Sequence, residues 1–584
     1  MTKKIIALVL ALMMALAMTA CSTPSTEPSA APSDPGTGEP TAQPAGDEPT
    51  GEVVTLKYYE IGNQDTNTRE AVQNAINEYI EPKIGANIEF QIVGWGDWDS
   101  KALVALQSGE EIDLFFTADW KNYMRSVTQN LFTPLNDDNG ENGNLLELYG
   151  QDILNSLNPA FITGTQVNGV NYAVPTNKEL CVPQGYIYNI DAANEVGMDP
   201  AAIKTLEDLE PYLAKYKELH PEQYPYITDG RWVHEPWVEG FANITGNLLT
   251  IKMNPDENGV YDDTVYSIWE TPEQTAYANT IYKYNQAGYL HPDTSLATYD
   301  AANNGEFAAG KFLVYAAPLK GDNIKAQEMK IAAGNPALNL GEIYIQNKIV
   351  CTTHTGGSML AIPTTSENPV TAMKFINMMH SDTNLLDMML FGVPETMWTF
   401  ADDGRVEIID SSWYGAHGGA WTMGNTAIQH VTTDEDPEKN QKLAAYSADA
   451  VPHPSLGFRY ACPQELEAQW ASVNNVQDAM NKALMTGAVN PETALPQYIA
   501  DLKAAGLDDL KADIEKKYAE WKAATGAANE PAPSTEPVAS TEPAASTEPT
   551  DTTEPTDSAE PTDSAEPTDS AEPSAEPTET PAAE

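Results

Sequence analysis

The sequence predicts an α/β protein whose folded part divides into two lobes, and three observations lead to this prediction. Strand-like and helix-like patterns alternate from Val53 onward, which is typical of doubly wound sheets. The region from Val53 to Thr525 holds about 470 residues, more than one hydrophobic core supports. Both ends of the 584-residue chain are too polar to form a core. We therefore expect two lobes, each a mainly parallel sheet flanked by helices, between disordered acidic tails.

The N-terminus has the features of a bacterial export signal. Lys3 and Lys4 precede an apolar run of about fourteen residues that ends at Met18, too short to be a permanent membrane span. The next residues, Thr19-Ala20-Cys21, resemble a lipobox, in which a peptidase cuts before a cysteine that carries lipid. We expect residues 1–20 to be a lipoprotein signal peptide. Lipid on Cys21, including palmitate, would hold the protein at the extracytoplasmic face of the cell membrane. An ordinary signal peptide with a chance cysteine is the alternative.

Two segments have compositions that oppose folding. Residues 21–52 and 526–584 are rich in Pro, Ser, Thr and Glu, and the second repeats Pro-Thr-Asp-Ser-Ala-Glu between Pro555 and Glu572. Neither segment can bury enough apolar surface to offset the conformational entropy lost on ordering. We expect the first to be a tether. The second, with its extended acidic repeats, could be a solvating brush, an O-glycosylated stalk or a cell-wall spacer.

Charge and missing motifs exclude several function classes. The net charge of −54 argues against nucleic acid as a partner. The sequence has no G-x-x-x-x-G-K-[ST], H-E-x-x-H or G-x-S-x-G motif, and its four cysteines have no zinc-site spacing. We therefore expect no catalytic residues, no metal and no cofactor. Residues 254–262 resemble the start of a calcium loop, but Val265 occupies the position of its glutamate, so a turn at Asn258-Gly259 is favoured.

The first part of the core alternates strand and helix patterns. Residues 53–60 and 87–93 alternate and are rich in β-formers, and residues 112–116 form a short apolar run, so we expect three strands. Residues 67–79 and 100–108 have helical periodicity, and Gly109 ends the second helix. This β-α-β-α-β order predicts a parallel sheet, with ligands beyond the carboxyl ends of its strands.

Aromatic and acidic residues follow these predicted strands. Trp95 and Trp98 come after the second strand, and Asp119 and Trp120 come after the third. Carboxylates bind sugar hydroxyls, and large rings cover the C–H face of a sugar, so we expect these four residues to bind a saccharide. The alternative is that the tryptophans anchor their loops by packing on the core.

Two later clusters are candidates for the lobe-two side of the ligand site. The first is the densest group of aromatic and charged residues in the chain: Arg231, Trp232, His234, Glu235 and Trp237. The second is rich in glycine and large rings: Trp413, Tyr414 and Trp421. The alternative for the first cluster is an exposed turn with its tryptophans packed inward.

A series of ordered motifs carries a family resemblance. Five segments resemble family 1 extracellular solute-binding proteins: 168–175, 186–198, 306–311, 356–363 and 368–375. Four more resemble the LipO-like lipoproteins that end in a DUF3502 domain: 385–395, 454–458, 486–492 and 502–506. Pro394 and Trp398 depart from that subgroup's pattern, so no ligand contact is carried over to them.

The resemblance implies a type II periplasmic-binding-protein-like fold with ligand in a cleft that closes by hinge motion. Lobe one would comprise 53–175 with 319–380, and lobe two 176–318 with 381–525, the chain crossing near Pro175 and Pro318. It implies a monomeric, non-enzymatic lipoprotein that captures a carbohydrate, expected to be an oligosaccharide, and delivers it to ABC permease subunits. The alternatives are a surface carbohydrate-binding protein without a transport role and a glycoside hydrolase with two carboxylates.

Overall fold

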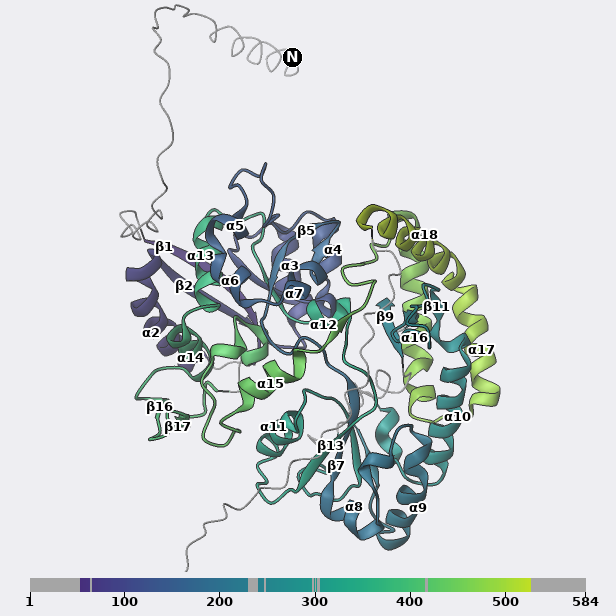
Figure 1. Cartoon of the computed structure of the whole chain (residues 1–584). Helices are drawn as coiled ribbons and strands as arrows, with labels where there is room; N and C mark the ends of the chain where they lie inside the picture. Colours follow the sequence, from purple (N-terminus) through teal and green to yellow (C-terminus); the bar gives the residue numbers. More distant parts are fainter. Residues whose placement is uncertain are drawn as a thin grey trace, which may run out of the picture. The chain divides into compact units, whose positions relative to one another are not determined.

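The computed structural model describes residues 53–63, 66–228, 240–245, 248–296, 299, 301, 305–414 and 418–526 (Figure 1). The predicted signal peptide, Cys21, the tether, the acidic tail beyond Gly526 and the cluster from Arg231 to Trp237 lie outside the described residues. The chain divides into two compact units, of which the first comprises 1–254 and 262–528. Within the second unit, the Asp256 carboxylate accepts backbone N–H groups of Asn258 and Val260 at 2.9 Å, so this segment forms the favoured turn.

The first sheet holds the three predicted strands. Its order is β2 (Ala86–Val93), β1 (Val54–Ile61), β3 (Leu114–Thr117), β15 (Met359–Ala361) and β6 (Ala173–Pro175). β1 is parallel to β2 and β3, as predicted, but β15 is antiparallel to both β3 and β6. The sheet is therefore mixed rather than mainly parallel, because a strand that follows the second lobe enters it in the opposite direction.

The predicted helices cover this sheet. They are α2 (Thr66–Ile84) and α3 (Trp98–Ser108), and Gly109 caps α3 in the left-handed conformation, with its N–H directed to Ala105 and Leu106 carbonyls. Leu56, Tyr58 and Phe90 are buried with side chains of α2, α13 (Pro369–Met379) and α14 (Thr383–Phe391). We call the first sheet with the elements packed on it lobe one.

A second sheet forms the centre of lobe two. Its order is β13 (Leu340–Tyr344), β7 (Gln184–Asn189), β12 (Val314–Pro318) and β8 (Tyr226–Ile227). Only β12 and β8 are parallel, so the predicted parallel sheet is wrong for this lobe. Gly185 permits the close approach of β7 and β13, because a Cβ atom there would lie 2.0 Å from the Ile343 carbonyl oxygen.

The observed pairing differs from the expected lobe assignment at two places. Pro318 ends β12, but the chain turns back through α11 (Ile324–Ala332), and β13 pairs with β7 in the second sheet. Residues 319–358 therefore do not return to the first sheet, and the chain rejoins it only at β15. Conversely, α14 and Trp413 were expected in lobe two, yet they pack in the hydrophobic cluster of lobe one.

The C-terminal region packs on lobe two as a set of three helices, α16 (Glu467–Met485), α17 (Pro491–Ala504) and α18 (Leu507–Thr525), beside α10 (Pro272–Gln286) (Figure 1). Tyr277 donates its hydroxyl to the Met485 carbonyl at 2.7 Å, and Asn285 donates to the Thr486 carbonyl at 3.0 Å. An antiparallel sheet of β11 (Tyr266–Ser267), β10 (Leu249–Lys252) and β9 (Phe241–Thr245) also belongs to this lobe.

Three segments connect the lobes, at 176–183, 345–358 and 453–457. The second contains β14 (Ile349–Val350), which pairs in parallel with β18 (Val451–Pro452) just before the third. Side chains of β14 alternate between the lobes, since Val350 is buried in the lobe-one cluster while Ile349 and Cys351 are buried in the lobe-two cluster. The paired segments therefore lie between the two cores.

Shorter elements complete the described chain: α4 (Tyr123–Thr128), α5 (Leu145–Tyr149), α6 (Gln151–Ser156), α7 (Pro159–Gly164), β4 (Gln166–Val167), β5 (Val170–Asn171), α8 (Ile190–Val196), α9 (Glu210–Leu219), α12 (Thr352–Thr355), β16 (Trp398–Phe400), β17 (Val406–Ile408) and α15 (Lys439–Ser447). Short 3-10 turns, including Asp119–Lys121 and Ala420–Thr422, carry several residues of the site described below. In the part of the chain that the structure describes, every helix is too short or too polar to span a membrane.

Candidate functional site

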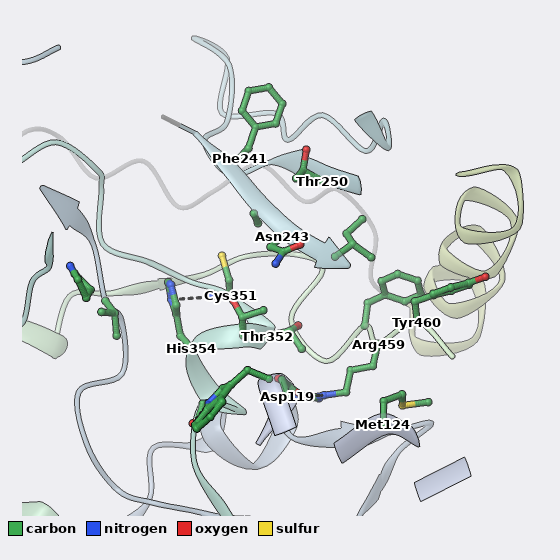
Figure 2. A pocket seen from close by; sticks show the side chains of 18 of the residues that line it. Asp119, Met124, Phe241, Asn243, Thr250, Cys351, Thr352, His354, Arg459 and Tyr460 are labelled. Atoms are coloured by element: carbon green, nitrogen blue, oxygen red, sulfur yellow. Dashed lines mark hydrogen bonds and ion pairs between the residues drawn. The ribbon is translucent and has the colours of Figure 1, made fainter. Parts of the chain in front are cut away.

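A cavity of about 1420 Å³ is lined by both lobes and by the C-terminal region (Figure 2). Lobe one contributes loops that follow β2 and β3, and lobe two contributes β9 and β10. The connecting segments contribute residues around Lys178 and α12. The C-terminal region contributes residues 458–462 and the inner face of α16. Chain segments far apart in sequence thus converge on one site.

Three tryptophans form an aromatic surface in this cavity. Trp95 follows β2, Trp120 follows β3, and Trp421 lies in a 3-10 turn. The ring centroids of Trp95 lie 6.3 Å from Trp120 and 6.0 Å from Trp421, with interplanar angles of 18° and 22°. Trp95 and Trp120 are 36% and 49% exposed, and the Trp120 indole donates to the Gly357 carbonyl at 2.7 Å. These oriented rings can cover the C–H face of a sugar.

Three other predicted binding residues do not line the cavity. Trp98 is buried against Phe115 and Phe116, because it lies on the face of α3 that packs on the sheet. Trp413 is buried in lobe one and donates its indole N–H to the Met389 carbonyl at 2.8 Å. Tyr414 is half-buried and packs on Phe391, 5.5 Å between ring centroids. Trp98 therefore follows the packing alternative, and Trp413 and Tyr414, for which only ligand binding was expected, pack in lobe one outside the cavity.

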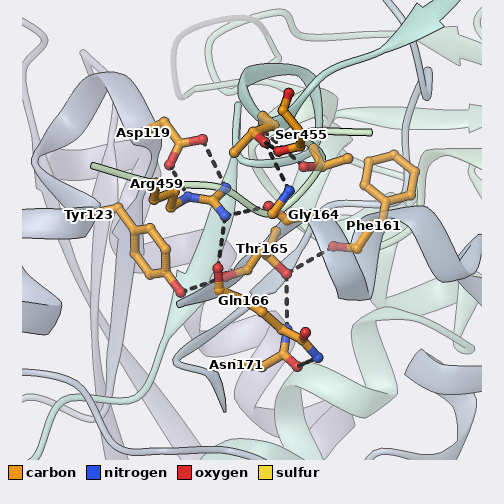
Figure 3. A network of polar contacts seen from close by, with 12 residues as sticks. Asp119, Tyr123, Phe161, Gly164, Thr165, Gln166, Asn171, Ser455 and Arg459 are labelled. Atoms are coloured by element: carbon orange, nitrogen blue, oxygen red, sulfur yellow. Dashed lines mark hydrogen bonds and ion pairs between the residues drawn. The ribbon is translucent and has the colours of Figure 1, made fainter. Parts of the chain in front are cut away.

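Asp119 lines the cavity but is bound to a residue that sequence reasoning missed. Arg459 forms a bidentate ion pair with the Asp119 carboxylate, Nε to Oδ1 at 2.8 Å and Nη2 to Oδ2 at 3.0 Å (Figure 3). Arg459 also donates to the carbonyls of Gly164 and Gln166, and its guanidinium lies 5.5 Å from the ring centroid of Tyr123. A single arginine in the segment Gly457–Tyr460 carries no pattern, so no sequence signal could have found it.

Charged side chains near the connecting segments are paired. The Lys178 ammonium lies 3.4 Å from the Glu179 carboxylate, and the Lys320 ammonium lies 3.0 Å from the Glu328 carboxylate. Burial alone would raise the pKa of Glu179, but Lys178 and Lys320 outweigh it and hold the pKa below its ordinary value. Each of these charged side chains beside the cavity is therefore neutralised by an oppositely charged partner.

The cavity also contains a half-buried histidine and a buried thiol. His354 accepts the Cys351 backbone N–H at 3.3 Å (Figure 2). Burial, together with Lys178, lowers the pKa of His354 to about 4, so the ring is neutral at pH 7. Burial raises the pKa of Cys351 to about 12, which keeps the thiol protonated and a poor nucleophile. Among the described residues, no three His, Cys, Asp or Glu side chains are grouped so that they could hold a metal ion.

Two family models match the chain. Residues 74–394 match the model described as bacterial extracellular solute-binding protein. Residues 454–523 match a domain of unknown function, DUF3502. The second match covers the C-terminal helices and the segment that contains Arg459.

Known proteins resemble the chain over most of its length. A carbohydrate ABC transporter substrate-binding protein of Streptococcus pneumoniae serotype 4 is 27% identical over 491 residues, which cover 82% of this chain and 92% of the relative. The crystal structure of the N-glycan transport solute binding protein NgtS from S. pneumoniae has a TM-score of 0.69 at 24% identity and covers 80% of this chain and 98% of that one. The S. pneumoniae ABC-transporter substrate binding protein FusA, in complex with kestose, has a TM-score of 0.53 at 14% identity, with 80% and 99% covered.

Proposed function

This chain belongs to the bacterial extracellular solute-binding protein family, and we propose that it captures an oligosaccharide outside the cell for an ABC importer. The S. pneumoniae relative is a substrate-binding protein of a carbohydrate ABC transporter. NgtS structures contain Man1GlcNAc or Man5GlcNAc, and the FusA structure contains kestose. Within this family, the ligand of the present chain is set by the side chains of its own cavity.

The observation that carries the proposal is the tryptophan surface in the cavity. The rings of Trp95, Trp120 and Trp421 lie 6.0–6.3 Å apart between centroids, and Trp95 and Trp120 are partly exposed, so a pyranose or furanose ring can stack its C–H groups on them. The cavity volume of about 1420 Å³ is larger than the roughly 300–1,000 Å³ of ordinary small-molecule sites. Both properties favour a ligand of several sugar rings over a single sugar.

The proposed mechanism is capture without chemistry. The ligand enters between the lobes, the connecting segments bend, and the lobes close over it in a type II binding-protein cycle. A micromolar complex requires about −8 kcal/mol, which stacked rings and hydroxyl hydrogen bonds supply after entropy costs. The protein acts as a monomer, and permease subunits receive the ligand unchanged. A surface carbohydrate-binding protein without permeases is the second candidate.

Binding measurements with a matched pair of variants test the proposal. Wild-type protein is titrated by calorimetry with Man1GlcNAc, Man5GlcNAc and kestose, and one of these should bind. Trp120→Ala should weaken that binding at least tenfold, because it removes a stacking face. Trp413→Ala should lower stability by about 3–5 kcal/mol and leave affinity unchanged. If Trp120→Ala lowers the melting temperature but not the affinity, Trp120 is only a packing residue. Recovery of cleaved glycan would favour the hydrolase alternative.

We also propose that lipid on Cys21 anchors the mature protein to the outer side of the cell membrane. Support comes from the positively charged Lys3 and Lys4, from the apolar run that follows them up to Met18, and from the lipobox-like Thr19-Ala20-Cys21. Cys21→Ser should move the protein from the membrane fraction to the medium, as measured by immunoblotting of both fractions. Continued membrane association of the variant would contradict lipidation at this residue.

A further inference from the structure

The C-terminal region that matches a domain of unknown function lies at the ligand cavity. We propose that residues 454–523 contribute directly to ligand binding, because they form one wall of the cavity. Within this region, Arg459 holds the loop that carries Trp120 in its binding position. This inference rests on the proposed function. It assigns to the region a role in saccharide recognition, in addition to its packing on lobe two.

The first argument is the wall itself. Phe458, Tyr460, Trp470, Asn481 and Met485 all line the cavity, although the first two come from a loop and the other three from near the two ends of α16. The Tyr460 and Trp470 rings lie 5.9 Å apart and 37° from coplanar. Asn481 is fixed by the Trp269 indole, which donates to its side-chain oxygen at 3.0 Å. The wall thus offers the half-buried ring of Trp470, packed against the buried ring of Tyr460, and an oriented amide, which are groups that bind sugars.

The second argument is the geometry of Arg459. Its side chain is 5% exposed and directs four hydrogen bonds to lobe one: two to the Asp119 carboxylate and two to the carbonyls of Gly164 and Gln166 (Figure 3). Burial alone would lower the pKa of the guanidinium, but Asp119 outweighs it and raises the pKa. A planar guanidinium that binds a carboxylate through two parallel hydrogen bonds fixes the orientation of the carboxylate as well as its distance. The neighbours of Arg459, Phe458 and Tyr460, belong to the lobe-two core.

The third argument connects Asp119 to the adjacent Trp120. The Asp119 backbone N–H donates to the Gly356 carbonyl at 2.8 Å, and the Trp120 indole donates to the Gly357 carbonyl at 2.7 Å. A Cβ atom on Gly356 would lie 2.1 Å from Asp119 Oδ2 and 2.6 Å from Arg459 Nη2, so only glycine admits this contact. Arg459, Asp119 and residues 356–357 therefore form one packed unit that sets the position of the Trp120 ring.

A ligand-free measurement tests whether Arg459 positions Trp120. The protein is labelled with 5-fluorotryptophan, and the ¹⁹F resonances of Trp120 and Trp98 are assigned through Trp→Phe variants. Arg459→Lys keeps a cation beside Asp119 but loses the bidentate pair that fixes the direction of the carboxylate. The Trp120 resonance should therefore shift or broaden. The Trp98 resonance, from the lobe-one core, should stay in place and shows that the fold is retained. An unchanged Trp120 resonance in Arg459→Lys would overturn the positioning role.

Calorimetry with Man5GlcNAc, or with Man1GlcNAc or kestose if only that sugar binds, tests the wall and the coupling. Trp470→Ala should weaken binding at least tenfold. Trp521→Ala is the matched control, because Trp521 lies in the same region but does not line the cavity, and it should change affinity less than twofold. Asp119→Asn and Arg459→Lys should each weaken binding about tenfold, and the double variant should be no weaker than the worse single variant. Additive losses would mean that Asp119 binds the ligand independently of Arg459.

The outcomes separate this inference from the proposed function. If Trp120→Ala weakens glycan binding while Trp470→Ala and Arg459→Lys do not, the proposed function stands and the C-terminal region has only a structural role. If none of the three sugars binds the wild-type protein, the proposed function fails for these sugars, and the ¹⁹F measurement still decides whether Arg459 holds Trp120.

Discussion

Glu328→Gln is expected to remove a pH-dependent contribution to stability at the junction of the lobes. Glu328 lies on α11, 23% exposed, with its carboxylate 3.0 Å from Lys320 and 3.3 Å from Lys439. Burial alone would raise the pKa of Glu328, but the three nearby lysines lower it from 4.5 to about 2. That difference corresponds to about 3 kcal/mol of folding free energy at pH 7. Because the folded-state pKa is depressed, the contribution is complete above pH 4.5 and is lost as pH falls toward 2.

Urea denaturation of wild type and Glu328→Gln at a series of pH values measures this contribution. The variant should be less stable by about 3 kcal/mol at pH 7, and the difference should shrink steadily below pH 4.5. Glu438→Gln is the control, because Glu438 is 65% exposed and 3.6 Å from Lys442, and exposed pairs contribute about 0–1 kcal/mol. A difference for Glu328→Gln that is absent at pH 7, or constant down to pH 3, would refute the reasoning.

Two further predictions concern stability. Burial lowers the pKa of His380 to about 3, so the folded state keeps this ring neutral while the unfolded chain protonates it near pH 6.5. Stability should therefore fall as pH drops below 6.5, and His380→Asn should recover about 3 kcal/mol of that loss at pH 4 in thermal melts. A chain ending at Gly526 should melt like the full-length protein. One ending at Gly506 loses four buried side chains of α18, worth about 6–12 kcal/mol, and circular dichroism should show it unfolded.

Local patterns predicted lobe one well because its first elements are continuous in sequence. In β1 and β2 polar and apolar residues alternate, and β3 is a short apolar run, so each strand could be predicted from its own residues. The rule that ligands meet the carboxyl ends of strands then placed Trp95 and Trp120 at the cavity. Trp98 could have been excluded from the sequence. It is followed by Ala102 and Leu106 at helical spacing, which marks the buried face of α3.

Features that depend on distant segments could not be predicted in this way. β15 has three residues and pairs with β3 more than two hundred positions earlier, so it has no readable periodicity and no local partner. The antiparallel pairing of β13 with β7 has the same origin. Arg459 gains its role only from the carboxylate and carbonyls that the fold brings to it. Composition could not distinguish that arginine from an exposed one.

The β14–β18 pair has a mechanical consequence for the motion of the lobes. Two hydrogen-bonded strands form a ribbon that flexes easily across its flat faces, whereas flexing within its plane must stretch the bonds between the strands. The flat faces are also those that carry Val350 toward one core and Ile349 toward the other. We therefore expect directional stiffness: this short ribbon should resist sideways shear of one lobe past the other, and opening and closing should be the softer motion.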